Sequence, residues 1–426
     1  MFKRRKVSLM LVFVLAVGVL FTFSACGDDD EVADGEVDGP TTITVGTWAD
    51  ESLGEAIELF NEEYPDIEVE TQIADMDDHH DTLLTRIAAD GEVPDVAYIE
   101  VDHIGRLAAQ GGFEDLYEEP YNAREHRDKL VDYPFNQAEN EDGQLMGMPT
   151  DVAPGTIFYR HDRLEEIGMD IDDINDFDDW IEAGEKFAES GDDRWLLADA
   201  ALIYELVLNS GDYDRYFDED GESLVTTDRF VEAFTMAQKV HEMGLDAQVE
   251  AWSDSWFEVL NEGQVLMQPK GAWLGGHLRD WIAPDTAGDW RVAEIPEGYE
   301  GSWGGSFAAI PEASENKEAA WKFIEFMATN EELQWQNFEI ADMYPTIESL
   351  YDREEFSEPV DFFGGQQVRE IWADTLSDID GMRTTQHDTL AEDVLASALS
   401  DVIEDGRDPL EALQEADDMI LRRTNR

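Results

Sequence analysis

The chain of 426 residues contains a single cysteine, Cys26, and only 28 lysine and arginine residues. One cysteine cannot form a disulfide within the chain, so a disulfide-stabilised fold is excluded. The few basic residues are opposed by 101 aspartate and glutamate residues, which gives a formal net charge of −73. A surface of that charge repels nucleic acids and anionic lipid headgroups, and we therefore exclude both as partners.

The sequence also lacks the short motifs that usually mark a cofactor or a catalytic centre. It contains no glycine-rich phosphate-binding loop, no zinc-ligand spacing and no nucleophile elbow. The adjacent residues His79 and His80 cannot share one face of a helix, so we interpret them as a solvated face and not as a metal site. Carboxylate pairs arise by chance at every spacing in so acidic a chain, so they do not indicate a glycoside hydrolase. We predict no catalytic residue, no metal and no cofactor.

Apolar residues are abundant enough for a large folded body. Hydrophobic residues make up 42% of the chain, which includes 12 tryptophans. A chain of this length exceeds one ordinary core, so two domains are expected. We interpret the acidic excess as a solvated surface and hypothesise a high-salt habitat, where salt screens the self-repulsion.

The first 25 residues have the pattern of a lipoprotein signal peptide. A basic segment, Lys3–Lys6, precedes the continuous apolar run Val7–Phe23, and Ser24-Ala25-Cys26 comes next. This ending resembles a bacterial lipobox, in which the cysteine is lipidated and becomes the new N-terminus, although Phe23 stands where leucine is usual. The alternative is an uncleaved membrane anchor, for which about 17 apolar residues is short.

The segment after this cysteine has the composition of a tether. Residues 26–40 are acidic, contain glycine and show no apolar periodicity. Such a segment is typical of a flexible linker that holds a folded body away from a membrane. We therefore expect the protein at the extracellular face of the bacterial cytoplasmic membrane, on the cell surface or in the periplasm, anchored through a lipid on Cys26.

From Thr41 the pattern alternates between strands and helices. Apolar strands are predicted at 43–48, 67–73 and 95–100. Helices are predicted after an Asp50 cap, over 81–90 and over 104–110. This alternation is typical of a doubly wound, mostly parallel sheet.

The rest of the chain combines a few strands with many helices. Residues 143–169 lead out of the first domain through a polar turn at Thr150-Asp151, and we interpret the residues beyond this turn as a second domain. Further strands are predicted at 156–159, 265–267, 290–296 and 307–310. Helices are predicted at 163–167, 178–190, 195–210, 228–243, 274–281, 316–329, 331–339, 365–376, 388–404 and 409–422.

Candidate ligand contacts lie directly after the predicted strands. Trp273 stands between a strand and a helix, where ligands are met in α/β folds. Trp48 comes after the first strand, and Glu100 and Asp102 come after the third. A tryptophan taken alone is as readily a core residue, and we interpret Trp281, on the next helix, as core.

Five segments in this order resemble the extracellular solute-binding proteins of ABC transporters, in the maltose-binding-protein-like carbohydrate branch. They are GEVPDVAYIE (91–100), GMPTDVAPGTIFYRHDRLEEIGM (147–169), FEVLNEGQVLMQPKGAWLGGHL (257–278), WGGSFAAIPEASENKEAAWKFIEFM (303–327) and MYPT (343–346). The resemblance covers almost the whole chain from 41 to 424. It implies a two-lobed periplasmic-binding-protein-like fold (type II), each lobe a mostly parallel sheet flanked by helices.

The same resemblance implies how the chain divides between the lobes. The N-terminal lobe would comprise 41–150 and 304–329, and the C-terminal lobe 151–303 and 330–426. The chain would cross between them near Asp151–Pro154, Gly301–Gly305 and Thr329.

A sugar-binding cleft between the lobes is also implied. Trp273 matches the family's stacking tryptophan, and Trp48 and Trp303 would be further platforms for the apolar faces of a sugar ring. Glu100, Asp102 and Asp151 would accept hydrogen bonds from sugar hydroxyls. Gly304 and Gly305 would let backbone amides approach the ligand. Tyr204, Trp252 and Trp256 match possible contacts of the second lobe, but we interpret them as core.

The implied function is that of a non-catalytic, monomeric receptor that captures an oligosaccharide and delivers it to the permease subunits of an ABC importer. One alternative is the same fold binding a polyol, a glycerol-phosphate diester or a uronate oligomer. An anionic solute would require basic residues, which are scarce around Trp48, Asp151 and Trp273. The other alternative is an extracellular glycoside hydrolase, which would shorten the oligosaccharide that a receptor only binds.

Overall fold

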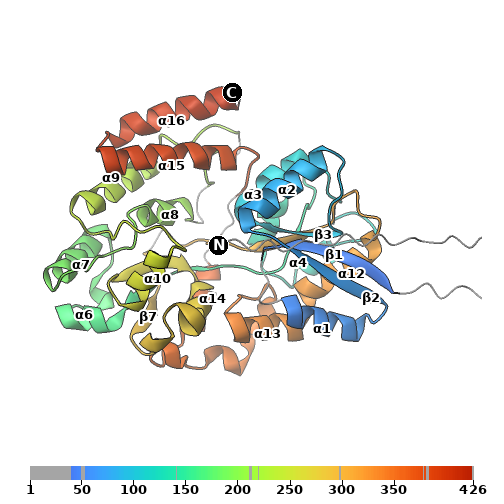
Figure 1. Cartoon of the computed structure of the whole chain (residues 1–426), viewed down its shortest axis with the longest axis horizontal. Coiled ribbons are helices and arrows are strands. Elements are labelled where there is room, and N and C mark those ends of the chain that lie inside the picture. Colours follow the sequence, from blue (N-terminus) through green and yellow to red (C-terminus); the bar gives the residue numbers. More distant parts are fainter. Residues whose placement is uncertain are drawn as a thin grey trace, which may run out of the picture. The chain divides into compact units, whose positions relative to one another are not determined.

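Two β-sheets organise the chain in the computed structural model (Figure 1). The structure describes residues 40–48, 53–140, 142–210, 214–218, 220–296, 299–377, 379 and 383–424. The predicted signal peptide, Cys26, the tether up to residue 39 and the Asp50 cap lie outside these described residues. No helix in the described ranges is long and apolar enough to cross a membrane.

The first sheet has five strands in the order β2-β1-β3-β8-β4. Its strands are β1 (Thr41–Thr47), β2 (Ile67–Ile73), β3 (Val96–Glu100), β4 (Met148–Pro149) and β8 (Ser306–Ala309). The strand β1 is parallel to β2 and β3, whereas β8 is antiparallel to β3 and β4. Because β8 runs in reverse, its first residue, Ser306, pairs with the last residue of β3, Glu100. This register brings the segment before β8 to the carboxyl ends of the parallel strands.

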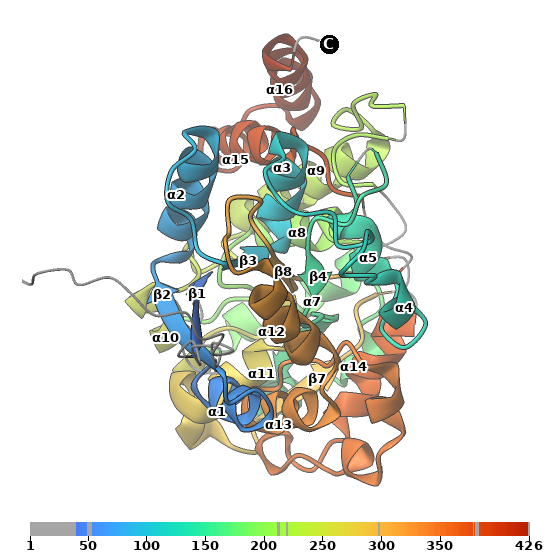
Figure 2. The same ribbon diagram turned by 90° about the vertical axis from the view of Figure 1, so that its right-hand side faces the viewer.

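Helices cover both faces of the first sheet. In Figure 2, α2 (Met76–Ala88) and α3 (Val101–Gln110) lie on one side of it, and α1 (Leu53–Glu63) and α12 (Lys317–Thr329) on the other. The apolar residues of α1 recur at helical spacing, which puts Leu53, Ala56 and Phe60 into the core. Two short helices, α4 (Arg124–Arg127) and α5 (Tyr133–Ala138), complete this part.

The second sheet has three strands in the order β6-β5-β7. They are β5 (Gly155–Arg160), β6 (Met267–Gly271) and β7 (Trp290–Ala293). Both outer strands are antiparallel to β5, so the prediction of a mostly parallel second sheet was wrong. Pro269 lies inside β6, and an edge strand tolerates a residue without a backbone N–H.

An apolar stretch that we predicted as one helix contributes to this difference. Of residues 195–210 only Leu202–Leu208 are helical, forming α8. Trp195 and Leu197 instead make isolated parallel bridges with Val265 and Asp246. Parallel pairing beside the second sheet is thus limited to these single bridges. The sequence did not predict them, because a short buried apolar run has the same hydrophobicity in a helix and in a strand.

The remaining helices surround the second sheet. In Figure 1, α15 and α16 lie side by side next to α9, and α15 also packs against α3 of the first sheet. The bounds are α6 (His161–Ile167), α7 (Phe177–Glu189), α9 (Asp228–Glu242), α10 (Asp254–Asn261), α11 (Leu274–His277), α13 (Glu331–Ala341), α14 (Val368–Ser377), α15 (Asp388–Asp405) and α16 (Pro409–Arg423). Short 3-10 turns cover 171–173, 284–286, 348–352, 354–357 and 361–363, and a π-helical turn, Leu278–Ile282, comes after α11.

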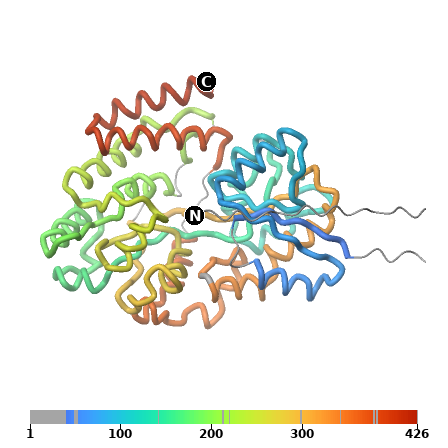
Figure 3. The backbone as a smooth tube through the Cα atoms, in the orientation of Figure 1, coloured from blue at the N-terminus to red at the C-terminus, as the bar shows by residue number. Residues whose placement is uncertain are grey.

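The chain passes between the two sheets through paired extended segments, which can be followed in the tube of Figure 3. The segment that leaves β4 meets the segment that returns to β8. The Trp303 N–H donates to the Ala153 carbonyl at 2.8 Å, and the Gly155 N–H donates to the Gly301 carbonyl at 2.9 Å. These bonds hold the two crossings side by side and place Asp151 next to Ser306.

Candidate functional site

Two glycines shape the segment that returns to the first sheet. Gly304 and Gly305 have φ angles of +123° and +130°, a region that side chains rarely allow. The Gly305 carbonyl accepts the Val101 N–H at 3.1 Å, which joins this segment to the start of α3. A Cβ atom at Gly304 would lie 3.5 Å from Nε1 of Trp273. The structure therefore brings Gly304 to the predicted stacking tryptophan, whereas a Cβ atom at Gly305 would lie 3.5 Å from the Asp151 carbonyl oxygen.

Asp151 fastens the same segment. One of its carboxylate oxygens accepts the Ser306 N–H, and the other lies 3.4 Å from the Ser306 hydroxyl. Burial raises the pKa of this carboxyl, while the hydrogen bonds from Ser306 oppose the shift. Asp151 thus positions the crossing in this structure, and a direct bond to a ligand stays a prediction.

The two acidic residues after β3 have different surroundings. An oxygen of Glu100 accepts the Asp102 N–H at 2.7 Å and thereby caps α3. Asp102 forms an ion pair with Arg215, which lies between α8 and α9 and is 5% exposed. Burial raises the pKa of Asp102, but the charge and hydrogen bond of Arg215 outweigh it and hold that pKa below its usual value. Burial, reinforced by the charge of Asp102, raises the pKa of Glu100 well above its usual value.

Arg215 therefore joins the second part of the chain to the predicted site in the first, and sequence reasoning missed it. Glu392 of α15 lies near the same pair, and burial together with the charge of Asp102 raises its pKa to about 7. Asp388, one turn earlier, is buried, which raises its pKa, whereas Arg215 lowers it. One buried cation thus faces four carboxylates, Glu100, Asp102, Asp388 and Glu392. No local pattern signals this cluster, because it draws on three separate parts of the chain.

A second cation was also missed. Lys270 of β6 donates to a Glu205 oxygen at 2.8 Å, and its Nζ lies 5.5 Å from the centre of the Trp303 ring. Trp303 is only 5% exposed, so little of its ring is open. Its Nε1 is buried without a hydrogen-bond partner among the described residues. The structure brings Trp303 to the site, while its role as a stacking platform stays a prediction.

The ring of Trp48 packs against two histidine rings. Its ring lies 5.0 Å from that of His80 and 5.9 Å from that of His79, and His80 stacks on His103 at 3.9 Å. Both His79 and His80 are buried, so the interpretation of this pair as a solvated face was wrong. The helix α2 begins at Met76, earlier than predicted, and turns both rings toward β3.

The hydrogen bonds of His80 define its protonation. One ring nitrogen, Nδ1, lies 2.7 Å from the Met76 carbonyl, and the other, Nε2, lies 3.0 Å from the Glu100 N–H. The amide can only donate, so Nε2 must accept and Nδ1 must carry the proton. His80 is therefore neutral, and it holds the backbone of Glu100 in place.

We expect His80 to make the fold sensitive to acid. Burial, aided by the charge of His103, lowers its pKa from 6.5 to about 3. Below about pH 6.5 His80 takes up a proton in the unfolded chain but stays neutral in the folded chain. The contribution of His80 to the free energy of unfolding is therefore complete above about pH 6.5 and is lost as the pH falls toward 3. Denaturant titrations should show a loss of up to about 1.4 kcal/mol per pH unit from this group.

The comparison is with His80→Gln, which cannot take up the proton. The gap in unfolding free energy between wild type and this variant should narrow as the pH falls. His161→Gln, at a side chain that is 40% exposed, is the matched control and should leave the profile unchanged. Parallel pH profiles for wild type and His80→Gln would refute the assignment.

Trp273 is half-buried and is held at its edge. Its Nε1 donates to the Trp303 carbonyl at 2.9 Å, so the ring is fixed to the crossing segment. The ring of Trp252 lies 5.7 Å away at an interplanar angle of 15°. Of the four aromatic residues that we interpreted as core, Tyr204 and Trp256 are buried, whereas Trp252 is 48% and Trp281 46% exposed.

Local backbone geometry explains the two wrong core predictions. Trp281 falls in the π-helical turn Leu278–Ile282, and the wider turn rotates it off the face that a regular helix would bury. Trp252 has a φ of +67°, a backbone conformation that is rare for a bulky residue. Neither feature is visible in the hydrophobic pattern.

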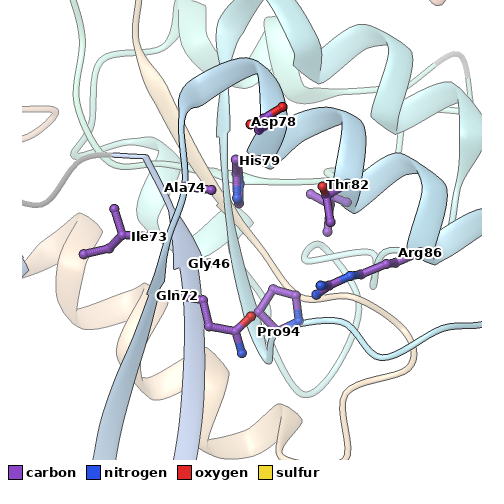
Figure 4. A pocket seen from close by; sticks show the side chains of 10 residues that line it. Gly46, Gln72, Ile73, Ala74, Asp78, His79, Thr82, Arg86 and Pro94 are labelled. Atoms are coloured by element: carbon purple, nitrogen blue, oxygen red, sulfur yellow. The ribbon is translucent and has the colours of Figure 1, made fainter. Parts of the chain in front are cut away.

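A cavity lies away from these residues, at the first sheet. It measures about 480 Å³ and lies between the edge of β1 and β2 and the helix α2, with Gln72, His79 and Arg86 among its lining residues (Figure 4). A neighbouring cavity of about 430 Å³ shares Gln72 and Arg86. None of the predicted site residues lines either cavity, so the candidate site is defined by converging side chains.

Comparison with known proteins identifies a family model and relatives to which this chain is similar. A family model described as "Bacterial extracellular solute-binding protein" matches residues 41–334. The chain is 25% identical to an arabinooligosaccharide-binding protein of Halalkalibacterium halodurans over 414 residues, 92% of each chain. It is 29% identical to a lactose-binding protein of Rhizobium radiobacter over 266 residues, 58% of this chain and 62% of that one.

Solved structures have the same fold. An ABC-transporter-associated binding protein of B. animalis subsp. lactis in complex with β-1,6-galactobiose aligns with a TM-score of 0.77 at 22% identity, covering 90% of this chain and 98% of that chain. A Listeria monocytogenes ABC substrate-binding protein in complex with cycloalternan aligns with a TM-score of 0.76 at 21% identity, covering 91% and 99%. The predicted two-lobed α/β class is thereby confirmed. Since the family model spans both sheets and the crossings between them, the chain belongs to the bacterial extracellular solute-binding proteins.

Proposed function

We propose that this protein is the receptor of an ABC importer and that it binds a neutral oligosaccharide between its two lobes. The observation that carries the proposal is the position of Trp273. Its indole is fixed by the Trp303 carbonyl, beside Gly304 of the crossing segment. Relatives of similar length are named as arabinooligosaccharide-binding proteins.

The chemistry around Trp273 suits a sugar. An aromatic face offers area to the C–H face of a sugar ring, and ionised carboxylates accept strong hydrogen bonds from hydroxyl groups. Asp102, whose pKa is held below its usual value, supplies such oxygens from the first lobe. The carboxyl groups of Glu100 and Glu392 have raised pKa values, so in their protonated form they can donate a hydrogen bond to a hydroxyl oxygen as well as accept one. This combination is a polar edge beside an apolar face, as a sugar ring requires.

The arrangement of charge argues against an anionic solute. The two cations of the site are Arg215, paired with Asp102, and Lys270, paired with Glu205. Further carboxylates surround both pairs, so a phosphate or uronate group would meet net negative charge. A neutral ligand is therefore favoured over the glycerol-phosphate diester and the uronate oligomer.

We assign the lobes to 41–150 with 304–329 and to 151–303 with 330–426. Hydrogen bonds between Ala153 and Trp303 and between Gly155 and Gly301 support a hinge at the paired crossings. Contacts of α14 with β5 and β7 support the placement of the C-terminal helices in the second lobe. Closure of such lobes on a ligand would present the complex to the permease subunits.

The N-terminal assignments complete the proposal. A lipid on Cys26, after removal of residues 1–25, would anchor the receptor to the membrane, with the acidic segment 26–40 as its tether. The receptor would act as a monomer, since each molecule carries a whole site, and it would lack catalytic activity.

Ligand binding without turnover is the direct test. We expect arabinooligosaccharides to raise the melting temperature by mass action and to change tryptophan fluorescence. A ligand at a hundred times its Kd should stabilise the fold by about 2.7 kcal/mol. Chromatography of the same mixtures should recover the sugars at full length. Shortened products would support the glycoside hydrolase instead, and an unmoved melting temperature across arabino-, galacto- and maltooligosaccharides would contradict sugar binding.

The acidic surface leads to a separate expectation. With 101 acidic and 28 basic side chains, self-repulsion should destabilise the fold at low salt and be screened as the Debye length falls from about 10 Å at 0.1 M to about 3 Å at 1 M. The melting temperature measured in a potassium chloride series should therefore rise with the salt concentration. A melting temperature independent of salt would argue against a high-salt habitat.

A further inference from the structure

Trp252 and Trp281 are unusual in being open to solvent. The chain has 12 tryptophans, and these two, at 48% and 46% exposure, are the only ones among them that the structure exposes. An exposed indole adds little hydrophobic stabilisation to the fold. Adjoining exposed aromatic residues mark binding surfaces more often than single ones do. Trp252 adjoins Trp273, the candidate sugar platform, and Trp281 adjoins Trp252.

The three indoles form one near-parallel group, which we call the tryptophan platform (Trp252, Trp273 and Trp281). The ring of Trp252 lies 5.7 Å from that of Trp273 at 15° and 6.5 Å from that of Trp281 at 22°. The ring of His277 meets all three edge-on, at 5.6 to 5.9 Å. Because Nε1 of Trp281 also donates to Nδ1 of His277 at 3.0 Å, the rings are held in place. Aromatic area therefore continues from the candidate site to the surface.

The backbone at Trp252 gives an independent indication of a role in binding. Its φ of +67° is rare for a bulky residue. Such strain persists where the surroundings impose it, and it concentrates at ligand-binding sites. Here the next residue, Ser253, caps α10 by accepting the Trp256 N–H at 3.2 Å. The cap thus holds the residue directly after Trp252 at the start of α10.

Charges beside the platform are already paired. Arg279 donates to Asp280 at 2.7 Å and to the buried Asp342 at 2.8 Å. The neighbouring cation is thus neutralised, and the platform offers apolar faces without a free positive charge. A neutral polymer with apolar faces fits this surface better than an anionic one.

We propose that Trp252 and Trp281 bind further sugar rings of an oligosaccharide whose first ring stacks on Trp273. The proposal rests on the sugar-binding function above and adds the length of the ligand. The receptor would prefer chains of three or more units to a disaccharide, because only longer chains reach the exposed indoles. These two residues would then set chain-length specificity.

Calorimetry with an arabinooligosaccharide series, from disaccharide to hexasaccharide, tests this for wild type, Trp252→Ala and Trp281→Ala. We expect wild-type affinity to rise with length and each variant to lose about tenfold for the longer chains, the effect of one aromatic stack. Disaccharide affinity should be unchanged. Trp281→Tyr should retain most of the affinity, and Ile340→Ala, at a 50% exposed residue of α13, is the matched surface control.

The outcomes separate the two proposals. Wild-type affinity that does not depend on length contradicts the platform and leaves sugar binding standing. Equal losses for short and long chains in both variants also contradict it, because they indicate a general effect on the site. Wild-type protein that binds no member of the arabino-, galacto- or malto- series contradicts both. Melting temperatures of all variants verify that each one is folded.

Discussion

Trp273→Ala should weaken oligosaccharide binding by at least ~2 kcal/mol, or roughly thirtyfold, the scale of a buried aromatic anchor. Trp273 is the point where the crossing segment and the second lobe meet, through its bond to the Trp303 carbonyl. The alanine removes the aromatic face that the sugar would use. Titration calorimetry gives the affinity, and far-ultraviolet circular dichroism verifies the fold.

The conservative variant separates stacking from support. Trp273→Phe retains an aromatic face but cannot donate to the Trp303 carbonyl. If stacking dominates, its affinity should lie much closer to wild type than that of the alanine variant. Should Trp273→Ala bind with wild-type affinity, Trp273 is not part of the site.

Arg215→Met should destabilise the folded protein by about 2 kcal/mol at pH 8. Removing one partner of a fully buried ion pair typically costs about 3–5 kcal/mol, and we expect less because the Asp102 side chain is 40% exposed while that of Arg215 is 6% exposed. Without Arg215, the repulsion between Asp102 and its neighbours Glu100 and Glu392 loses its nearest compensating cation. Urea denaturation at fixed salt measures the loss.

The stability lost in Arg215→Met should be smaller at lower pH. The pKa of Glu392 is raised to about 7, and that of Glu100 is raised well above its usual value. An acid whose folded pKa is raised contributes stability that is complete below its unfolded pKa, here 4.5 for Glu392, and is lost as the pH rises through its folded pKa. Arg215→Met should therefore be closer to wild type at pH 5 than at pH 8.

Two further variants check the cause. Asp102→Asn combined with Arg215→Met should recover part of the stability, because the unpaired charge is gone. Lys239→Met removes an ion pair with Asp178 whose side chains are 41% and 86% exposed, and it should change stability by less than ~1 kcal/mol. A double variant no more stable than Arg215→Met would show that the cost arises from lost packing.

Much of the first lobe can be predicted from local pattern. The strands expected at 43–48, 67–73 and 95–100 are β1, β2 and β3 within two residues. These apolar runs are bounded by polar residues and alternate with amphipathic helices, so periodicity alone separates them. The same reasoning placed Glu100 and Asp102 at the carboxyl end of β3, because the ends of parallel strands lie along one edge.

The second lobe was harder to predict. Its sheet is antiparallel, and the apolar stretch 195–210 is only partly helical. A buried segment has no polar face from which to infer its period. A strand beside it is recognised only once its partner is known, and the partners Val265 and Asp246 are distant in sequence.

By itself, the sequence determined the family, the α/β class, the acidic surface and the tryptophan that we place at the centre of the site, Trp273. These depend on composition, order of motifs and local spacing. Only the tertiary structure decided that Arg215 meets Asp102 across 113 residues, that His80 is buried and neutral, and that Trp252 and Trp281 are exposed. The reason is physical: burial, charge pairing and ring contact depend on which distant segments pack together, and no local spacing records that.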